Sequence, residues 1–326
     1  MRTTTFASIL VVAACSASLG AQAQIASSLV DVTKTVMQPY DLSNWPGMTI
    51  LKGGKGYANT PWGQVHYRDI GPRGDVPPFF LMHQSPFSMA EFQPIQEDLA
   101  AAGFRSIAVD LPGYGSSDEP EQQPTIADYA KTMIAVLDIL GISKAVLVGH
   151  HTGASIAAAM AARYPERVVT VVLHGAPYYS ATESAQILSG RLHPRTLQAD
   201  GSHLTSFFDV ASGGHANPNR TREQIVNATW AVLGYFSQGR DYGHIAAFSN
   251  DMGADLARIT APTLVLSDPV MLHDNDVAAS RLRPNFTLVS LPRTSGNPLV
   301  ELAPLWTKTV TEFVTSSGGW PAKASR

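Results

Sequence analysis

The feature that most constrains this chain is a short turn with glycine at both ends, residues 149–153, which read Gly-His-His-Thr-Gly. An apolar run, residues 145–148, precedes the turn, and a helical stretch, residues 154–163, follows it. A Gly-x-nucleophile-x-Gly sequence between a strand and a helix is typical of a strained turn that exposes one reactive side chain. The central residue is normally Ser, Cys or Asp, but here it is His151. The pattern therefore indicates a catalytic scaffold, and the residue disfavours ordinary serine chemistry.

Composition predicts one large globular domain with a small insert. The chain has 326 residues, of which 44% are hydrophobic and 15% are charged, and its net charge is −3. No basic field is present to favour nucleic acid, and no internal stretch is long and apolar enough to span a bilayer. We therefore expect a small-molecule substrate, no nucleic-acid partner and no transmembrane segment. Composition gives no indication of the oligomeric state.

The N-terminus, residues 1–23, has the pattern of an export signal. Arg2 is its one positive charge, residues 6–19 are apolar, and Ala-Gln-Ala at 21–23 is a small-x-small cleavage site. Cleavage there removes Cys15, the one cysteine, and leaves no disulfide or thiol chemistry. An alternative cut directly before Cys15, in a sequence resembling a lipobox, would instead make this residue a lipid anchor. Either route predicts a periplasmic or secreted protein.

Strands alternate with helices along most of the remaining chain, which predicts a mainly parallel sheet covered on both faces. We expect strands at 64–69, 78–82, 106–110, 145–148, 168–173, 263–267 and 286–291. We expect helices at 91–102, 125–140, 154–163 and 300–314. The second of these helices begins with Thr125 and Asp128 in a capping-box arrangement.

Between residues 178 and 256 the strand pattern stops, and helical stretches, glycine-rich turns and aromatic residues replace it. We interpret this part as a helical cap whose aromatic residues mostly join it to the core, with two or three lining a pocket. The predicted organisation is a signal peptide (1–23), an N-terminal extension (24–58), a first core part (59–177), the cap (178–256), a second core part (257–316) and a tail (317–326).

Three motifs together resemble the α/β-hydrolase superfamily, in particular its branch of epoxide hydrolases, dehalogenases and carbon–carbon hydrolases. They are the turn at 149–153, the loop Asp-Leu-Pro-Gly-Tyr-Gly-Ser-Ser-Asp at 110–118, and His-Gln-Ser-Pro at 83–86. The resemblance covers about residues 62–313. It implies an eight-stranded, mostly parallel sheet with an inserted helical cap.

The resemblance also implies an oxyanion hole made of main-chain groups. The family has His-Gly-x-Pro in one loop, and Gln84 departs from the usual glycine. The N–H of Ser85 would still be placed to donate, and the N–H of Thr152, after the nucleophile position, would be the second donor. Because both donors are backbone groups, side-chain substitutions need not abolish the hole.

The other two triad positions also depart from the family pattern. Met271 falls where the acid belongs, after the strand at 263–267, and Gly296 falls on the position of the family histidine. Nearby residues could supply an acid or a base instead: Asp268, His273, Asp274 and Asp276. A conventional serine hydrolase is therefore not expected.

Three chemical roles are open for His151. It could act as a general base for water or for a substrate proton, with Asp268 or Asp274 fixing its tautomer. It could attack an acyl group directly and form an acyl-imidazole. It could bind a metal together with His83, His273 and Asp274, although their spacing matches no known metal signature.

The pocket near the turn should also contain two histidines of different default roles. His150 is expected to pack under the turn, and His83 to support its loop, beside Gln84. Substrates would be small, fairly apolar carbonyl compounds, cleaved by ester or lactone hydrolysis or by a lyase-type reaction, with no cofactor. The alternative is a catalytically inactive scaffold that binds a ligand or a partner.

Overall fold

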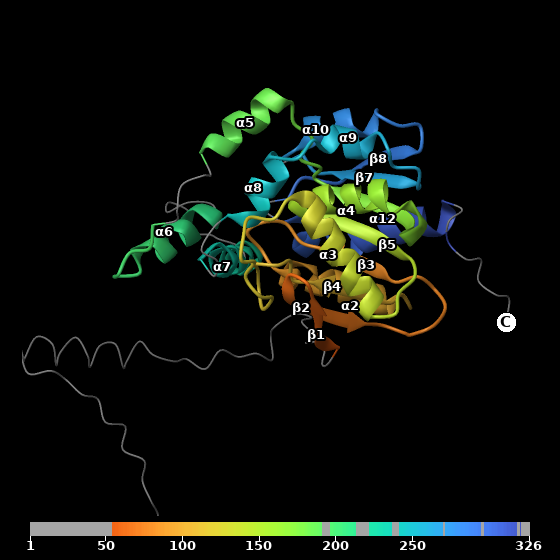
Figure 1. The fold of residues 1–326 in the computed structure, drawn as a ribbon, viewed down its shortest axis with the longest axis horizontal. Helices are drawn as coiled ribbons and strands as arrows, with labels where there is room; N and C mark the ends of the chain where they lie inside the picture. The colour runs from red at the N-terminus through yellow and green to blue at the C-terminus, as the bar shows by residue number, and fades with distance from the viewer. Residues whose placement is uncertain are drawn as a thin grey trace, which may run out of the picture. The chain divides into compact units, whose positions relative to one another are not determined.

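The computed structural model describes residues 54–190, 196–212, 222–236, 241–269, 271–294, 297–317 and 320. Its centre is an eight-stranded sheet with the order β1-β2-β4-β3-β5-β6-β7-β8 (Figure 1). The strands are β1 (Lys55–Thr60), β2 (Gly63–Ile70), β3 (Phe79–Met82), β4 (Ser106–Val109), β5 (Ala145–His150), β6 (Val168–His174), β7 (Thr263–Ser267) and β8 (Phe286–Ser290). β2 is antiparallel to both β1 and β4, and all the other pairs are parallel. The predicted mostly parallel α/β sheet is confirmed.

Burial along the strands follows their place in the sheet. Every residue of β3, β4, β5, β6 and β7 is buried, as expected for central parallel strands that are covered on both faces. Successive side chains point to opposite faces, so Phe80 and Met82 enter one hydrophobic core while Phe79 and Leu81 enter the other. Burial of this kind contributes roughly 25 cal/mol per Å² of apolar surface.

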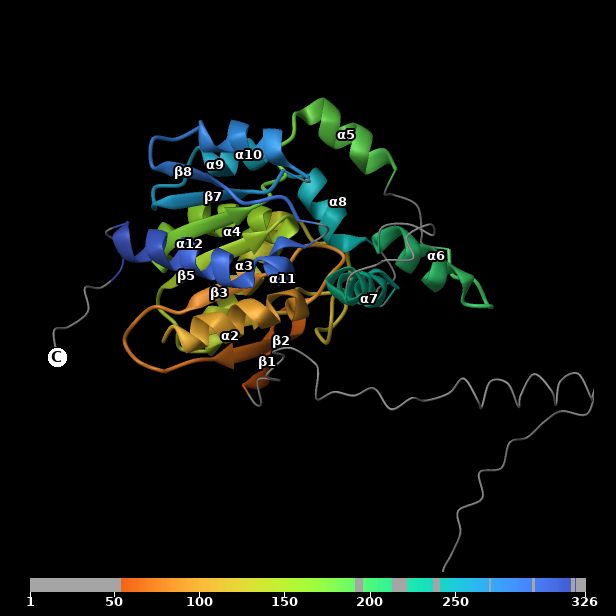
Figure 2. The same cartoon turned by 180° about the vertical axis from the view of Figure 1, so that it is seen from behind.

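Two helical layers cover the sheet, as Figures 1 and 2 show from opposite sides. One layer consists of α3 (Ile126–Ile139), α4 (Thr152–Arg163) and α9 (Met252–Leu256), and the other of α2 (Gln93–Ala101) and α12 (Ala303–Ser316). α4 is buried from Thr152 to Ala161, and its many alanines let neighbouring elements approach closely. This helix follows the sharp turn directly, so tight packing fixes the turn from below.

In the described part of the chain between β6 and β7, all the regular elements are helices, joined by loops. They are α5 (Ala181–Ser189), α6 (Ser202–Ala211), α7 (Arg222–Phe236), α8 (Tyr242–Phe248) and α9. α6 and α7 lie side by side beyond one end of the sheet in both ribbon views. Phe207 stacks on Tyr235 at 4.3 Å between ring centroids and meets Phe236 edge-on at 5.7 Å, so these aromatics join the two helices to each other.

Several boundaries differ from the expected ones for local reasons. β1 starts at Lys55, inside the predicted extension, because its pairing with β2 is not visible in its own sequence pattern. The expected helix at 300–314 is two helices, α11 (Pro298–Glu301) and α12, and Pro304 lies in the first turn of the second. α10 (His273–Ser280) occupies a stretch for which no helix was expected.

Predictions about the N-terminus fall outside the described residues. They concern the export signal at 1–23 and Cys15, and most of the extension at 24–58. Among the residues that are described, none of the helices has the length and apolarity needed to cross a membrane.

The capping box predicted for α3 is present. The Thr125 hydroxyl accepts from the N–H of Asp128 at 3.1 Å, and the Asp128 carboxylate accepts from the N–H of Thr125 at 2.9 Å. The arrangement satisfies two N–H groups that have no partner within the helix.

Replacement Thr125→Ala should lower the free energy of unfolding by about 1 kcal/mol. Urea denaturation measures the change. Ser180→Ala is the matched control, because it removes the same kind of box from α5, a helix with no buried residue. We expect a smaller loss for Ser180→Ala, because α5 packs no residue into the core whereas α3 buries eight, and equal losses would contradict this expectation.

Candidate functional site

The turn between β5 and α4 holds His151 in a strained backbone conformation. Its φ is 46° and its ψ is −106°, and among the described residues it is the sole non-glycine whose φ lies in the left-handed region. A Cβ at Gly149 would collide with the carbonyl of Gly153, and a Cβ at Gly153 would collide with the carbonyl of Met82. Both glycines are therefore required for the turn, whichever residue stands between them.

The ring of His151 lies against β6. A Cβ added at Gly175 would strike its Cδ2 and Nε2 atoms, and the ring centroid is 4.5 Å from that of His150. The backbone N–H of His151 donates to the carbonyl of His174 at 2.9 Å. The residue is partly exposed.

Its environment keeps the imidazole neutral. Burial lowers the pKa of His151 well below its usual 6.5, and the neighbouring rings of His150 and His174 lower this pKa further. The charge of Asp268 acts in the opposite direction. The ring therefore keeps a lone pair available throughout the neutral pH range.

His83 has a supporting position. It is fully buried, its Nδ1 donates to the carbonyl of Gln84 at 2.7 Å, and its Nε2 accepts from the N–H of Leu111 at 3.0 Å. Both ring nitrogens are occupied, and the pattern fixes a neutral tautomer. His83 therefore ties its own loop to the end of β4.

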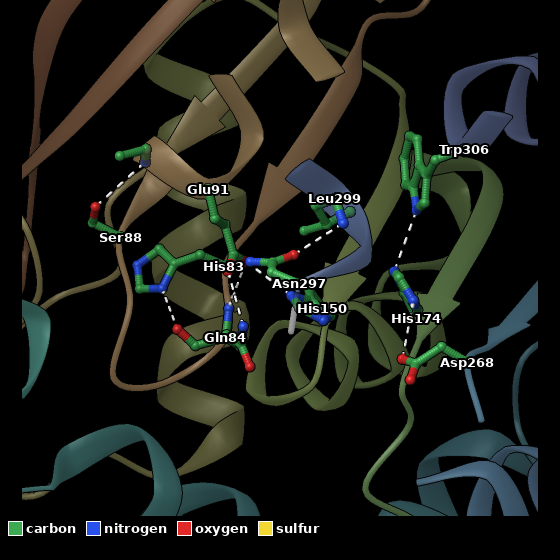
Figure 3. A network of polar contacts seen from close by, with 11 residues as sticks. His83, Gln84, Ser88, Glu91, His150, His174, Asp268, Asn297, Leu299 and Trp306 are labelled. Carbon is green, nitrogen blue, oxygen red and sulfur yellow. Dashed lines mark hydrogen bonds and ion pairs between the residues drawn. The ribbon is translucent and has the colours of Figure 1, made fainter. Parts of the chain in front are cut away.

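Glu91, which the sequence did not single out, is at the centre of a buried polar network (Figure 3). It belongs to η2 (Met89–Phe92) and is fully buried. Its Oε1 accepts from the N–H of Gln84 and is 3.1 Å from Nδ1 of His150, while its Oε2 accepts from Nε2 of Gln84. Burial raises the pKa of Glu91 to about 7.

A second carboxylate–imidazole pair lies on the other side of His150. Trp306 donates from Nε1 to Nδ1 of His174 at 3.3 Å, so the proton of that ring is on Nε2, which faces Asp268 at 3.7 Å. The rings of His150 and His174 are 4.8 Å apart. Asp268 is buried, and the structure places its carboxylate beside Nε2 of His174.

The remaining predicted acid and base lie in the first turn of α10. His273 and Asp274 are both exposed, and Nδ1 of His273 is 2.9 Å from the Ser267 hydroxyl. Asp276, two residues further along the helix, is buried instead and accepts from the N–H of Ala176 at 2.6 Å. Ala176 follows the glycine on which the His151 ring rests, so Asp276 is the α10 carboxylate that contacts this side of the site.

The two backbone donors expected from the sequence lie at buried positions. Ser85 follows β3, and its hydroxyl donates to that of Tyr114 at 2.9 Å. Thr152 is the first residue of α4, where backbone N–H groups have no partner within a helix. Neither N–H donates to another described residue.

In the described part of the chain, no group of three His, Cys, Asp or Glu side chains lies close enough together to hold a metal ion. His83 has both nitrogens occupied and His273 is exposed. The metal alternative from the sequence thus loses its proposed ligand set.

The family histidine position itself, Gly296, is outside the described residues. Its neighbour Asn297 is buried, and its Oδ1 caps α11 by accepting from the N–H of Leu299 at 2.9 Å. The loop after β8 therefore places an amide, not an imidazole, beside the site.

The chain is similar in sequence and in fold to several known proteins. A family model described as alpha/beta hydrolase fold matches residues 77–206. The chain is 31% identical to a 2-hydroxy-6-oxononadienedioate/2-hydroxy-6-oxononatrienedioate hydrolase of Burkholderia vietnamiensis, over 62% of this chain and 73% of that protein. It is 32% identical to a bifunctional esterase/perhydrolase of Acinetobacter calcoaceticus, over 65% and 80%. The enol-lactonase structure from Burkholderia xenovorans superposes with a TM-score of 0.65 at 23% identity, over 80% and 100%.

The raised pKa of Asp276, about 8 because of burial, predicts a pH-dependent stability. Between pH 7 and 8 the unfolded carboxyl is ionised while the folded one still holds part of its proton, so stability falls as pH rises, by about 1 kcal/mol for this group. Asp276→Asn should remove that decrease and keep an acceptor for Ala176. Denaturation at the two pH values measures the change.

The control for this experiment is Asp274→Asn, which makes the same replacement on the exposed surface of the same helix. It should leave the decrease in place. Identical pH slopes for the wild type and Asp276→Asn would show that the Asp276 proton is not retained on folding.

Proposed function

The chain belongs to the α/β-hydrolase family, and from that premise we propose that it is an exported enzyme that hydrolyses small, fairly apolar esters or lactones with His151 as general base. An esterase and an enol-lactonase are among the similar proteins. The observation that carries the proposal is the strained backbone that presents a neutral imidazole at the family's nucleophile position.

The chemistry follows from the protonation state of the ring. Neutral His151 removes a proton from water, and the resulting hydroxide adds to the substrate carbonyl carbon. The tetrahedral oxyanion accepts hydrogen bonds from the N–H groups of Ser85 and Thr152. Collapse breaks the bond to the alcohol leaving group, and the imidazolium returns its proton to that oxygen.

The low pKa of His151 affects the two proton transfers differently. It makes the imidazolium a strong acid, which favours protonation of the leaving group, and it makes the ring a weaker base towards water. Asp268 raises this pKa and so makes the ring a better base for the proton transfer from water. A buried carboxylate beside a buried pair of imidazoles is therefore consistent with a base that must charge transiently.

Direct attack by the ring is the second mechanism on the same scaffold. It would form an acyl-imidazole on His151, which water then hydrolyses. Rapid quenching with an activated aryl ester separates the two mechanisms, because only direct attack leaves an acyl group on the peptide that contains residues 149–153.

Carbon–carbon cleavage is a further activity that the same carbonyl chemistry allows, and the relative from Burkholderia vietnamiensis is named as a hydrolase of oxo-dicarboxylates. Water activated by His151 could add to a ketone and release a carbon leaving group as an enolate. A substrate panel should therefore contain aryl esters, lactones and vinylogous 1,5-diketones.

Replacement His151→Ala should lower kcat for esters or lactones by about 10²–10⁴-fold, the usual contribution of a general base. Steady-state hydrolysis of p-nitrophenyl esters and of lactones measures it. His203→Ala removes a partly exposed imidazole from α6 and should leave the rate unchanged. A fluorophosphonate probe should leave the wild-type protein unlabelled.

Equal rates for wild type and His151→Ala would remove His151 from the chemistry. Strong fluorophosphonate labelling would show a serine nucleophile instead. Absence of turnover across the whole panel, combined with tight binding of a substrate analogue, would favour the alternative that the scaffold binds ligands without catalysis.

A further inference from the structure

The loop after β3 and the turn after β5 approach each other at the carboxyl ends of neighbouring parallel strands. They carry Ser85 and Thr152, whose N–H groups must point at one substrate oxygen if the proposed hydrolysis is right. Oxyanion donors act only within about 3 Å of that oxygen. The relative position of the two segments is therefore a quantity that the protein has to control.

Glu91 contacts both segments. It accepts hydrogen bonds from the backbone N–H and from the side-chain amide of Gln84, the residue directly before Ser85, each 3.1 Å long. Its Oε1 is also 3.1 Å from Nδ1 of His150, the residue directly before His151. Figure 3 shows the carboxylate between these two partners.

The two segments already meet through the backbone, since Met82 pairs with Gly149 in the β3–β5 ladder and the carbonyl of Met82 lies close to Gly153. The loop is tied to the region after β4 by His83, which accepts from Leu111, and by Ser85, which donates to Tyr114. The turn is tied to β6 by the hydrogen bond from the N–H of His151 to the carbonyl of His174. Glu91 adds a side-chain link between the loop and the turn beyond this backbone contact.

We propose that Glu91 is a positioning residue that sets the separation of the two oxyanion donors by tying the loop at Gln84 to the turn at His150. The proposal rests on the proposed hydrolysis for its catalytic consequence. Its structural part, the tie itself, rests on the three hydrogen bonds alone. Gln84, which replaces the glycine usual in this loop, provides the side-chain half of the tie.

The location of Glu91 supports this role over that of an ordinary buried acid. Full burial of a carboxylate is costly unless each oxygen is hydrogen-bonded. In Glu91, Oε1 is bonded to Gln84 and His150, and Oε2 is bonded to Gln84. η2 continues directly into α2 and contacts β3, β4 and α11, so the backbone that carries Glu91 is itself held in place. The carboxylate is thus a rigid anchor for two segments that have to keep register.

The test compares Glu91→Ala with Glu91→Gln by steady-state kinetics on the best ester or lactone. The alanine variant loses the tie and should show kcat lowered by about 10–100-fold with little change in KM, because a small misplacement of donors affects the transition state most. Glutamine keeps Oε1 for the Gln84 N–H and His150, and the Gln84 amide can turn to accept from its Nε2. This variant should stay within about threefold of wild type.

Gln96→Ala is the matched control. Gln96 is buried on the helix that follows η2 and bonds the carbonyls of Arg68 and Ser106, away from the loop and the turn. This variant loses buried hydrogen bonds as Glu91→Ala does, and should keep the wild-type kcat. Equal loss of kcat in Gln96→Ala, or an unchanged kcat in Glu91→Ala, would overturn the proposal.

Backbone amide hydrogen exchange of residues 83–87 separates failure of this inference from failure of the proposed hydrolysis. Exchange in this segment should be at least tenfold faster in Glu91→Ala and unchanged in Glu91→Gln and Gln96→Ala. Unchanged exchange in Glu91→Ala overturns the tie, whatever the kinetics. Faster exchange in Glu91→Ala, together with an unchanged rate in His151→Ala, would retain the tie and reject His151 as the base.

Discussion

The backbone turn at His151 is the constraint on which the rest of the site depends. A positive φ at a non-glycine residue such as His151 costs about 1–3 kcal/mol and persists only where the surroundings enforce it. Here the enforcing groups are two glycines with no room for a Cβ and a fully packed α4. The turn fixes the position of the ring, which lies against Gly175 and 4.5 Å from the ring of His150.

The neighbourhood of that turn places several titratable groups in a small buried volume. Glu91–His150 and Asp268–His174 are two carboxylate–imidazole pairs with the His150 and His174 rings 4.8 Å apart. Desolvation acts on acids and bases in opposite directions, raising the pKa of Glu91 to about 7 and lowering that of His150. Both shifts favour neutral forms, so the network avoids the large cost of isolated buried charges. Hydrogen bonding then carries most of its organisation.

Local sequence signals predicted the elements that depend on local physics. The capping box at Thr125, the apolar runs of the central strands and the turn at 149–153 were readable because each involves residues a few positions apart. The pairing of Glu91 with His150 spans 59 residues and leaves no local pattern, so the sequence could not predict it. The acids after β7 show the same limit. Their candidacy came from proximity in sequence, but α10 turns Asp274 outward and Asp276 inward.

The placement of an imidazole on the turn also explains how the loop after β8 can lack a histidine. In the resembling family the base stands on that loop and must reach a nucleophile on the turn, so two loops have to agree in position. Here the base candidate is already on the turn, held by α4 and by the contact of its ring with Gly175. The loop after β8 is then free to serve the fold, and Asn297 caps α11 there. With the base on the turn, as we propose, the accuracy of the site depends on the loop that carries Ser85, and Glu91 and Gln84 supply an added tie there.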